Sequence, residues 1–275
     1  MNDSIQNMAD SLKDRFPGNF AAKMAIVCGS GLAAKIADHA EIIERIPYGD
    51  IDGFPKPSVS GHQGELFLAR FADSGADFLA FAGRVHLYEG ISTYKLLFQV
   101  RLTKALSFKN IIITCSVGSV CRYTPPGSVG LISEHIDLQM LGNRHIPIAK
   151  YPRPTRKSIY DRELAQIIKN GALRAGIEMR SGVLCSVSGP TYETPAEAAM
   201  AKKIGADWLS MSTAKETAEA ASLGLRTAGL VGVANFVDIS GSGNIITSHD
   251  DVLLAADRAS ESLWRCFSAA SQKLV

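Results

Sequence analysis

Two short stretches carry arginine and histidine side chains at a spacing suited to binding an anion. Arg84 and His86 follow an apolar run and stand two residues apart, which places both side chains on one side of an extended chain. His62 lies in GHQG, between two glycines of a loop that is free to close. Because arginine presents a planar fork that matches phosphate oxygens and histidine adds a donor, these residues predict a phosphate site.

The stretch MAIVCGSGLAAK, residues 24–35, supports two interpretations of one pattern. Gly29, Gly31 and Ala34 form G-x-G-x-x-A after an apolar run, which is the fingerprint of a dinucleotide-binding turn. The same turn could instead hold one free phosphate, with Ser30 adding a hydroxyl to the backbone donors at a helix start.

The acidic residue that a dinucleotide site requires is poorly placed in this sequence. It should lie about twenty positions further on, at the end of a second strand. Asp50 and Asp52 lie in a turn-like segment, and Glu41 and Glu44 follow too soon for a proper helix to intervene. A nicotinamide-dependent oxidoreductase is therefore a minor alternative.

Three helix starts carry capping signatures that explain three carboxylates structurally. A Ser or Thr followed three residues later by Glu or Asp satisfies the free backbone donors of a first helical turn. This pattern assigns capping roles, and no catalytic role, to Glu197, Glu216 and Asp251. Glu193 and Ser212 lie just outside these starts, and Ser212 precedes a helix N-terminus, where an anion is favoured.

Strand-like and helical patterns alternate along the chain, and together they must position these candidates. Apolar runs predict strands at 24–28, 65–71, 77–83, 110–116, 130–133, 182–188, 208–212 and 227–235. Helical patterns fill 92–108, 161–176, 195–205, 214–224 and 250–275, and an amphipathic helix lies within residues 1–20. These patterns predict an α/β fold, a single domain over residues 1–275 with a mixed, mostly parallel central sheet flanked by helices. Residues 140–157, with three prolines, predict an irregular loop.

The composition narrows the classes of protein to which the chain belongs. A formal net charge of +2 without a long basic run argues against a nucleic-acid partner. No apolar stretch reaches the roughly 18 residues of a membrane span, and the N-terminus lacks a signal-peptide core. Five cysteines without a C-x-x-C pair suit a reducing cytoplasm and give no metal signature.

The motifs, taken in order, resemble a known enzyme family. The succession GSGLA, GHQG, GRVHLYEG, GPTYETPAE, GADWLSMSTAKE and VANFV closely resembles the trimeric, low-molecular-mass purine nucleoside phosphorylases, with methylthioadenosine phosphorylases as near cousins. The resemblance covers roughly residues 24–260. It implies phosphorolysis of a purine (2′-deoxy)ribonucleoside to the free base and (deoxy)ribose 1-phosphate, a homotrimer, phosphate as co-substrate, and no metal or organic cofactor.

The resemblance also implies roles for individual residues. Phosphate ligands correspond to Ser30, His62, Arg84, His86, Ser116 through its backbone, and Ser212. Base contacts correspond to Tyr192, Glu193, Met211 and Asn235, and sugar contacts to Tyr88, Met211 and His249. Within this set the catalytic positions are His86, Glu193 and Asn235. A Glu193 carboxylate accepts from N1–H of a 6-oxopurine and an Asn235 amide donates to the departing N7, whereas an adenine-specific cousin usually has Ser and Asp near these places.

Several positions depart from the family pattern. The strand TCSVGS has Cys115 and Ser119 where the family has an Asn and a Gly, and a side chain in place of that Gly predicts crowding of the backbone near phosphate. Lys215 replaces a Pro and Phe236 replaces a Lys. Residues 142–157 lack the aromatic that reaches a neighbouring subunit's ribose, and Tyr151 is the aromatic nearby. These departures leave open a paralogue that binds nucleoside or phosphate without useful turnover.

Overall fold

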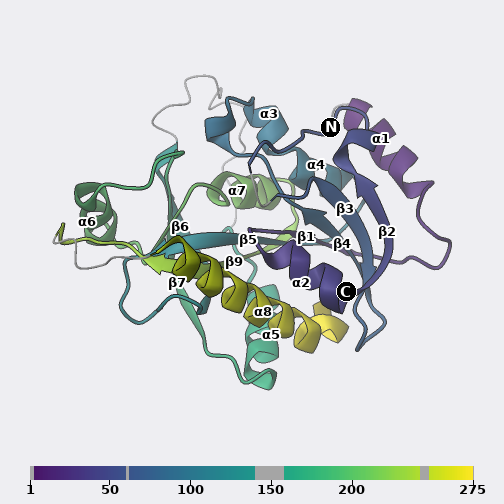
Figure 1. The fold of residues 1–275 in the computed structure, drawn as a ribbon. Helices are drawn as coiled ribbons and strands as arrows, with labels where there is room; N and C mark the ends of the chain where they lie inside the picture. Colours follow the sequence, from purple (N-terminus) through teal and green to yellow (C-terminus); the bar gives the residue numbers. More distant parts are fainter. Residues whose placement is uncertain (1–2, 60–61, 140–157, 242–247, 275) are drawn as a thin grey trace.

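The computed structural model describes residues 3–59, 62–139, 158–241 and 248–274 (Figure 1). Its strands are β1 (Met24–Val27), β2 (Glu41–Pro47), β3 (Glu65–Arg70), β4 (Asp77–Ala82), β5 (Asn110–Ser119), β6 (Val129–Asp137), β7 (Met179–Ser186), β8 (Trp208–Ser210) and β9 (Arg226–Phe236). Its helices are α1 (Asp3–Lys13), α2 (Leu32–His39), α3 (Thr93–Leu96), α4 (Phe98–Ala105), α5 (Arg162–Arg174), α6 (Pro195–Lys203), α7 (Ala214–Ser222) and α8 (His249–Leu274), with 3-10 turns η1 (Tyr48–Asp50) and η2 (Leu87–Glu89).

The described strands form one nine-stranded sheet in the order β2-β3-β4-β1-β5-β8-β7-β6-β9. Strand β9 also pairs with β5, so the five strands from β5 to β9 close on themselves. Five pairings are parallel (β1–β4, β1–β5, β5–β9, β6–β7 and β7–β8) and four are antiparallel. The predicted α/β fold with a mixed sheet is confirmed, with parallel pairings in a small majority.

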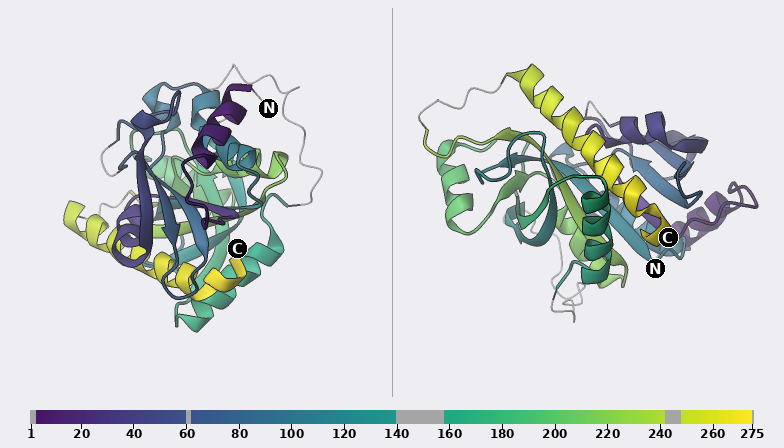
Figure 2. Two further views of the ribbon diagram at one scale, coloured as in Figure 1. Left: turned by 90° about the vertical axis from the view of Figure 1, so that its right-hand side faces the viewer. Right: turned by 90° about the horizontal axis from the view of Figure 1, so that it is seen from below.

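Helices cover both faces of the sheet (Figure 1). The central strand β1 shows why: Met24 and Ile26 pack into the core under α2, α5 and α8, and Ala25 and Val27 into the core under α1, α4 and α7. A strand that is buried on both faces has apolar residues at consecutive positions, and such a run is the pattern that predicted β1. The long helix α8 runs diagonally across its face of the sheet (Figure 2).

One strand and one helix differ from the sequence prediction. The eight-residue helix α2 does intervene after the glycine turn, and β2 follows it, so the prediction that no proper helix fits there was wrong. Strand β2 escaped prediction because it is an edge strand and most of its side chains are partly exposed. It pairs antiparallel with β3, and β3 and β4 separate it from β1. A dinucleotide-binding unit instead needs a parallel crossover to a strand near β1, so this topology disfavours the oxidoreductase.

Smaller differences concern element ends. Helix α1 lies within the predicted N-terminal segment and ends at Lys13. The pattern at 92–108 divides at Leu97 into α3 and α4. In the part of the chain that the structure describes, no helix has the length and apolar character of a membrane span. The predicted loop at 140–157, including Tyr151, lies outside the described residues.

Candidate active site

A cavity of about 840 Å³ lies where the carboxyl ends of several strands meet helix starts. It collects residues far apart in the chain, because parallel strands deliver their carboxyl ends to one edge of a sheet. Its lining includes eleven of the predicted site residues: Ser30, His62, Arg84, His86, Tyr88, Ser116, Tyr192, Glu193, Met211, Ser212 and Asn235. His249 is the first residue of α8, and its side chain lies outside the described part.

The glycine turn after β1 is shaped for close approach to β5 and α8. A Cβ at Gly29 would lie 2.9 Å from the Cys115 Cα, and the Gly29 N–H donates to Thr114 Oγ1 over 2.8 Å. Gly31 has φ +87°, where glycine is favoured, and caps α2 without a side-chain hydrogen bond. The turn therefore places Ser30 on the cavity wall beside a helix N-terminus, an arrangement that favours an anion.

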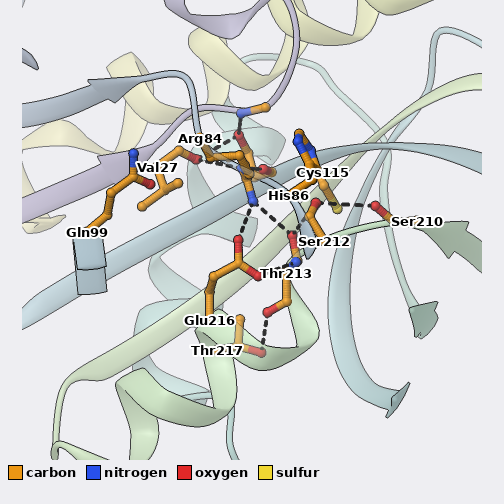
Figure 3. A network of polar contacts seen from close by, with 12 residues as sticks. Val27, Arg84, His86, Gln99, Cys115, Ser210, Ser212, Thr213, Glu216 and Thr217 are labelled. Carbon is orange, nitrogen blue, oxygen red and sulfur yellow. Dashed lines mark hydrogen bonds and ion pairs between the residues drawn. The ribbon is translucent and has the colours of Figure 1, made fainter. Parts of the chain in front are cut away.

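Arg84 is the buried cation of the cavity and is held from several directions (Figure 3). Its Nη1 donates to Glu216 Oε1 over 3.0 Å and to Thr213 Oγ1 over 3.3 Å. Its Nη2 donates to the carbonyl oxygens of Val27 and Thr114. This fixed guanidinium presents positive charge at the cavity without the freedom of a surface side chain.

Glu216 does more than its predicted capping role. Its Oε2 accepts from the Thr213 N–H over 2.5 Å, as a capping box requires, and its Oε1 pairs with Arg84. The prediction that capping alone explains this carboxylate was therefore incomplete. Glu197 and Asp251 contact Thr194 and Ser248 respectively, as their capping boxes predicted. Only the tertiary structure, which brings the first turn of α7 to the Arg84 side chain, could reveal the ion pair.

The two cavity histidines are neutral donors or acceptors because burial disfavours their charged forms. Burial first, and then the Arg84 cation, lowers the pKa of His62 to about 3 and the pKa of His86 below its usual value. The backbone N–H of Arg84 donates to His62 Nδ1 over 3.4 Å. Because Nδ1 accepts this bond, Nε2 is the protonated nitrogen of the neutral His62. The two rings lie 5.1 Å apart between centroids.

Glu89 orients His86, and sequence reasoning missed it. Its Oε1 accepts from the His86 backbone N–H over 2.5 Å and lies 3.3 Å from Nδ1, while Oε2 accepts from Ser58. A carboxylate at Nδ1 accepts the single ring proton of the neutral imidazole, so Nε2 is an acceptor for an O–H of a ligand. The signal was available, since Glu89 stands three residues after His86 in GRVHLYEG.

Backbone strain marks the position after Ser212. Thr213 has φ +82°, a region that a β-branched residue rarely adopts. The Glu216 carboxylate and the Arg84 guanidinium hold Thr213 in place (Figure 3). Such strain persists where the surroundings impose it, and it occurs most often at functional sites. Here it sets Ser212, buried beside Ser210, at the start of α7.

A second part of the cavity lining combines apolar side chains with the Glu193 carboxylate. Met211, Tyr192 and Val237 contribute apolar surface, and burial raises the pKa of Glu193. The Asn235 amide donates to the Phe236 carbonyl over 3.0 Å, which leaves its second N–H for another acceptor. This part can therefore take a flat ring with polar edges.

The departures from the family pattern are accommodated in different ways. Ser119 is fully buried away from the cavity lining, where its hydroxyl donates to the Cys121 carbonyl and contacts Thr124 Oγ1, so the predicted crowding near phosphate was wrong. Cys115 does line the cavity, and burial raises the pKa of its thiol. Lys215 is buried against Asp137, with Nζ 3.0 Å from Oδ2. Nothing in the structure explains Phe236.

The cavity lining combines two sets of groups with different chemistry. Arg84, His62, His86 and the helix starts suit a phosphate and are named the phosphate end; Glu193 and Asn235, with the apolar groups, suit a heterocyclic base and are named the base end. Among the described residues no group of three or more His, Cys, Asp or Glu side chains is placed to hold a metal ion. The α/β fold and this cavity together define the class of protein: one whose single cavity suits both a phosphate and a heterocyclic base, as in phosphorylases.

Comparisons with known proteins agree with this class. The family model of the phosphorylase superfamily matches residues 23–270. The chain is 33% identical to purine nucleoside phosphorylase 1 of Geobacillus stearothermophilus, over 97% of this chain and 96% of that protein. The chain therefore belongs to the phosphorylase superfamily and, within it, to the purine nucleoside phosphorylases.

Solved structures show the same fold. The purine nucleoside phosphorylase of Schistosoma mansoni in complex with inosine matches with a TM-score of 0.84 and 26% identity, over 99% of this chain and 97% of that one. Isoform 2 of that organism's enzyme, in complex with cytosine and ribose-1-phosphate, matches with a TM-score of 0.85 and 31% identity, with the same coverage.

Proposed function

We propose that this protein is a pentosyltransferase that catalyses phosphorolysis of 6-oxopurine (2′-deoxy)ribonucleosides, such as inosine and guanosine. The observation that carries the proposal is that one cavity is lined both by the cation and the histidines Arg84, His62 and His86 and by the carboxylate and amide of Glu193 and Asn235. The products are the free purine and (deoxy)ribose 1-phosphate. The relatives named above, which are purine nucleoside phosphorylases, support this assignment.

The proposed reaction exchanges one bond for another at the anomeric carbon of the sugar. The C1′–N9 bond breaks and its electron pair leaves with the purine, while a phosphate oxygen forms a bond to C1′. Arg84 and the Nε2–H of the neutral His62 donate to the phosphate, and Nε2 of the neutral His86 accepts from its protonated oxygen, with Ser30, Ser212 and the Ser116 backbone completing the ligands. A phosphate held beneath the sugar stabilises positive charge on the sugar before it attacks.

The base end stabilises the departing purine. Asn235 donates to N7 as negative charge develops there, and the Glu193 carboxylate accepts from N1–H. Tyr192 and Met211 contact the base, and Met211, Tyr88 and His249 contact the sugar in the same proposal. Tyr88 is suited to this because its ring stacks on His86, at 5.0 Å between centroids.

The assay that tests the function is phosphate-dependent release of hypoxanthine from inosine. Release that requires phosphate supports the proposal. Retained binding of inosine and phosphate without release would favour a paralogue without useful turnover, for which the Cys115 and Lys215 departures are the motivation. Reduction of a nicotinamide cofactor would favour the oxidoreductase, which the edge position of β2 argues against.

We further propose one phosphorylase domain over residues 1–275, a homotrimer, a cytoplasmic location, and a reaction without organic cofactor, metal or nucleic-acid partner. The single continuous sheet supports one domain, and five free cysteines suit a reducing compartment. The family resemblance supports the trimer. Sedimentation of a stable monomer at assay concentration would contradict it.

A further inference from the structure

Two buried glutamines lie behind the lining of the cavity, where each bonds the backbone of a segment that carries site residues. Gln139 follows β6 and is 2% exposed, and Gln99 lies on α4 and is 7% exposed. Neither reaches the cavity lining described above. The side-chain amide of each glutamine donates two hydrogen bonds. At least one of the two goes to a backbone carbonyl of a segment that carries site residues.

Gln139 joins the two segments that form the base end. Its Nε2 donates to the carbonyl oxygens of Val187 and Met211, both over 2.9 Å. Val187 follows β7 and begins the segment that carries Tyr192 and Glu193, whereas Met211 follows β8 and itself lines the cavity. One amide therefore sets the separation of the two walls between which the base would lie.

Gln139 is itself held by a partly buried ion pair. Its backbone N–H donates to Asp137 Oδ1 over 2.9 Å, and Asp137 Oδ2 accepts from Lys215 Nζ over 3.0 Å. Lys215 is the residue that replaces the family's Pro. The bonds therefore run from the start of α7 through the end of β6 to the walls of the base end.

Gln99 has the corresponding position behind the phosphate end. Its Nε2 donates to the Gly83 carbonyl over 2.7 Å and to Tyr48 Oη over 3.1 Å, and Tyr48 Oη donates to the same carbonyl over 2.8 Å. Gly83 directly precedes Arg84, whose backbone N–H contacts His62. Figure 3 shows Gln99 at the edge of the view of the Arg84 network.

We propose that Gln139 and Gln99 are positioning residues for separate halves of the site, Gln139 for nucleoside and Gln99 for phosphate. The inference rests on the proposed function. Its physical basis is that a buried amide bonded to two partners leaves both unsatisfied when it is removed, and the freed segments shift. When a ligand is bound by several groups at once, small displacements of those groups weaken its binding.

The test compares two apolar variants of similar shape, Gln139→Met and Gln99→Met. We expect Q139M to raise the KM for inosine about fivefold or more and to change the KM for phosphate less than about twofold, consistent with the loss of two hydrogen bonds. We expect Q99M to show the reverse. The matched control is Gln166→Met, since Gln166 is an exposed glutamine on α5 that bonds Asn170, and it should change neither value.

Opposite changes in the two variants, in which Q139M raises only the KM for inosine and Q99M only the KM for phosphate, form a crossed pattern. This pattern separates positioning from a general loss of stability. A merely destabilised enzyme has fewer active molecules and a lower apparent kcat, with both KM values retained. Equal changes in both KM values, or no change in either for both variants, would overturn the proposal. If Q139M does not fold, Gln139→Asn carries the same test, because its shorter amide keeps the donors but cannot span both carbonyls.

Binding measurements keep this inference distinct from the proposed function. Calorimetry of wild type and variants with inorganic phosphate and with hypoxanthine gives both dissociation constants without turnover. If wild type binds both ligands but releases no hypoxanthine from inosine, the proposed function fails, and the crossed pattern in the dissociation constants still supports the inference. If wild type turns over and the pattern is not crossed, the inference alone fails.

Discussion

Arg84 and Glu216 stand 132 positions apart in the chain and form a buried ion pair at the phosphate end of the cavity, with Nη1 3.0 Å from Oε1. The same carboxylate caps α7 through the Thr213 N–H. The pair therefore couples the end of β4 to the start of α7, the two places that supply the charge and the helix N-terminus for an anion (Figure 3).

Replacing Arg84 by Met should weaken the binding of phosphate far more than the binding of nucleoside. Loss of a charge-assisted hydrogen bond costs about 1.5–3 kcal/mol, so the KM for phosphate should rise at least about tenfold. Steady-state kinetics with each substrate varied in turn measures this. An unchanged phosphate KM would remove Arg84 from the phosphate site.

The same variant should also lose stability, because Glu216 is 4% exposed and would keep a buried, unpaired charge. Breaking a buried ion pair in this way costs about 3–5 kcal/mol. The double variant R84M/E216Q should recover part of this free energy of unfolding, measured in urea, but none of the phosphate affinity. Recovery of both would mean that Arg84 acts only through folding.

The stability of the protein should fall in acid partly because of His62. Burial, the Arg84 cation and His86 lower the pKa of His62 from 6.5 to about 3. Between these two values the unfolded chain binds more protons than the folded one, so the free energy of unfolding decreases as the pH falls from about 6.5 towards about 3. The limiting slope is about 1.4 kcal/mol per pH unit for one group.

The variant His62→Gln should therefore lose less stability than wild type between about pH 7 and about pH 5, measured by urea unfolding without phosphate. The exposed His39, paired with Glu261 at the surface, offers a control, and His39→Gln should behave like wild type. Identical acid profiles for wild type and H62Q would contradict a neutral, buried His62.

Glu193 should determine the preference for 6-oxopurines and one limb of the pH profile. Burial raises its pKa, and only the carboxylate accepts from N1–H, so kcat/KM for inosine should fall as the pH falls through this raised value. Glu193→Gln should remove that limb and lower kcat/KM for inosine at least about tenfold, the loss of one charge-assisted hydrogen bond. Comparable wild-type turnover of inosine and adenosine, or of methylthioadenosine, would contradict this role.

Asn235 should act mainly on the chemical step. Its free N–H meets N7 most strongly when the purine carries developing negative charge, so the contact strengthens in the transition state. Asn235→Leu should lower kcat about 10²-fold or more with a smaller change in the KM for inosine, as for other preorganised donors. A variant whose KM rises while kcat is retained would show that Asn235 only binds the base.

Much of this molecule was predictable because its signals are local. The continuous apolar run of β1 and the glycines at 29 and 31 follow from burial and backbone geometry that a few neighbouring residues determine. The capping boxes at Thr194 and Ser248 depend on residues three positions apart. Six motifs in family order sufficed to predict the class of site.

Other features were decided only by the tertiary structure. The strand β2 is half-exposed at a sheet edge, so its residues carry no strong apolar pattern, and its place beyond β3 is set by pairing. The local sequence predicts only a capping role for Glu216, and its second oxygen accepts from Arg84 because the tertiary structure brings the start of α7 to that side chain. Gln139 reads as an ordinary polar residue until β6, β7 and β8 bring two carbonyl oxygens within reach of one amide. Hydrogen-bond partners of buried polar groups depend on which chain segments meet, and that depends on the packing of the whole sheet.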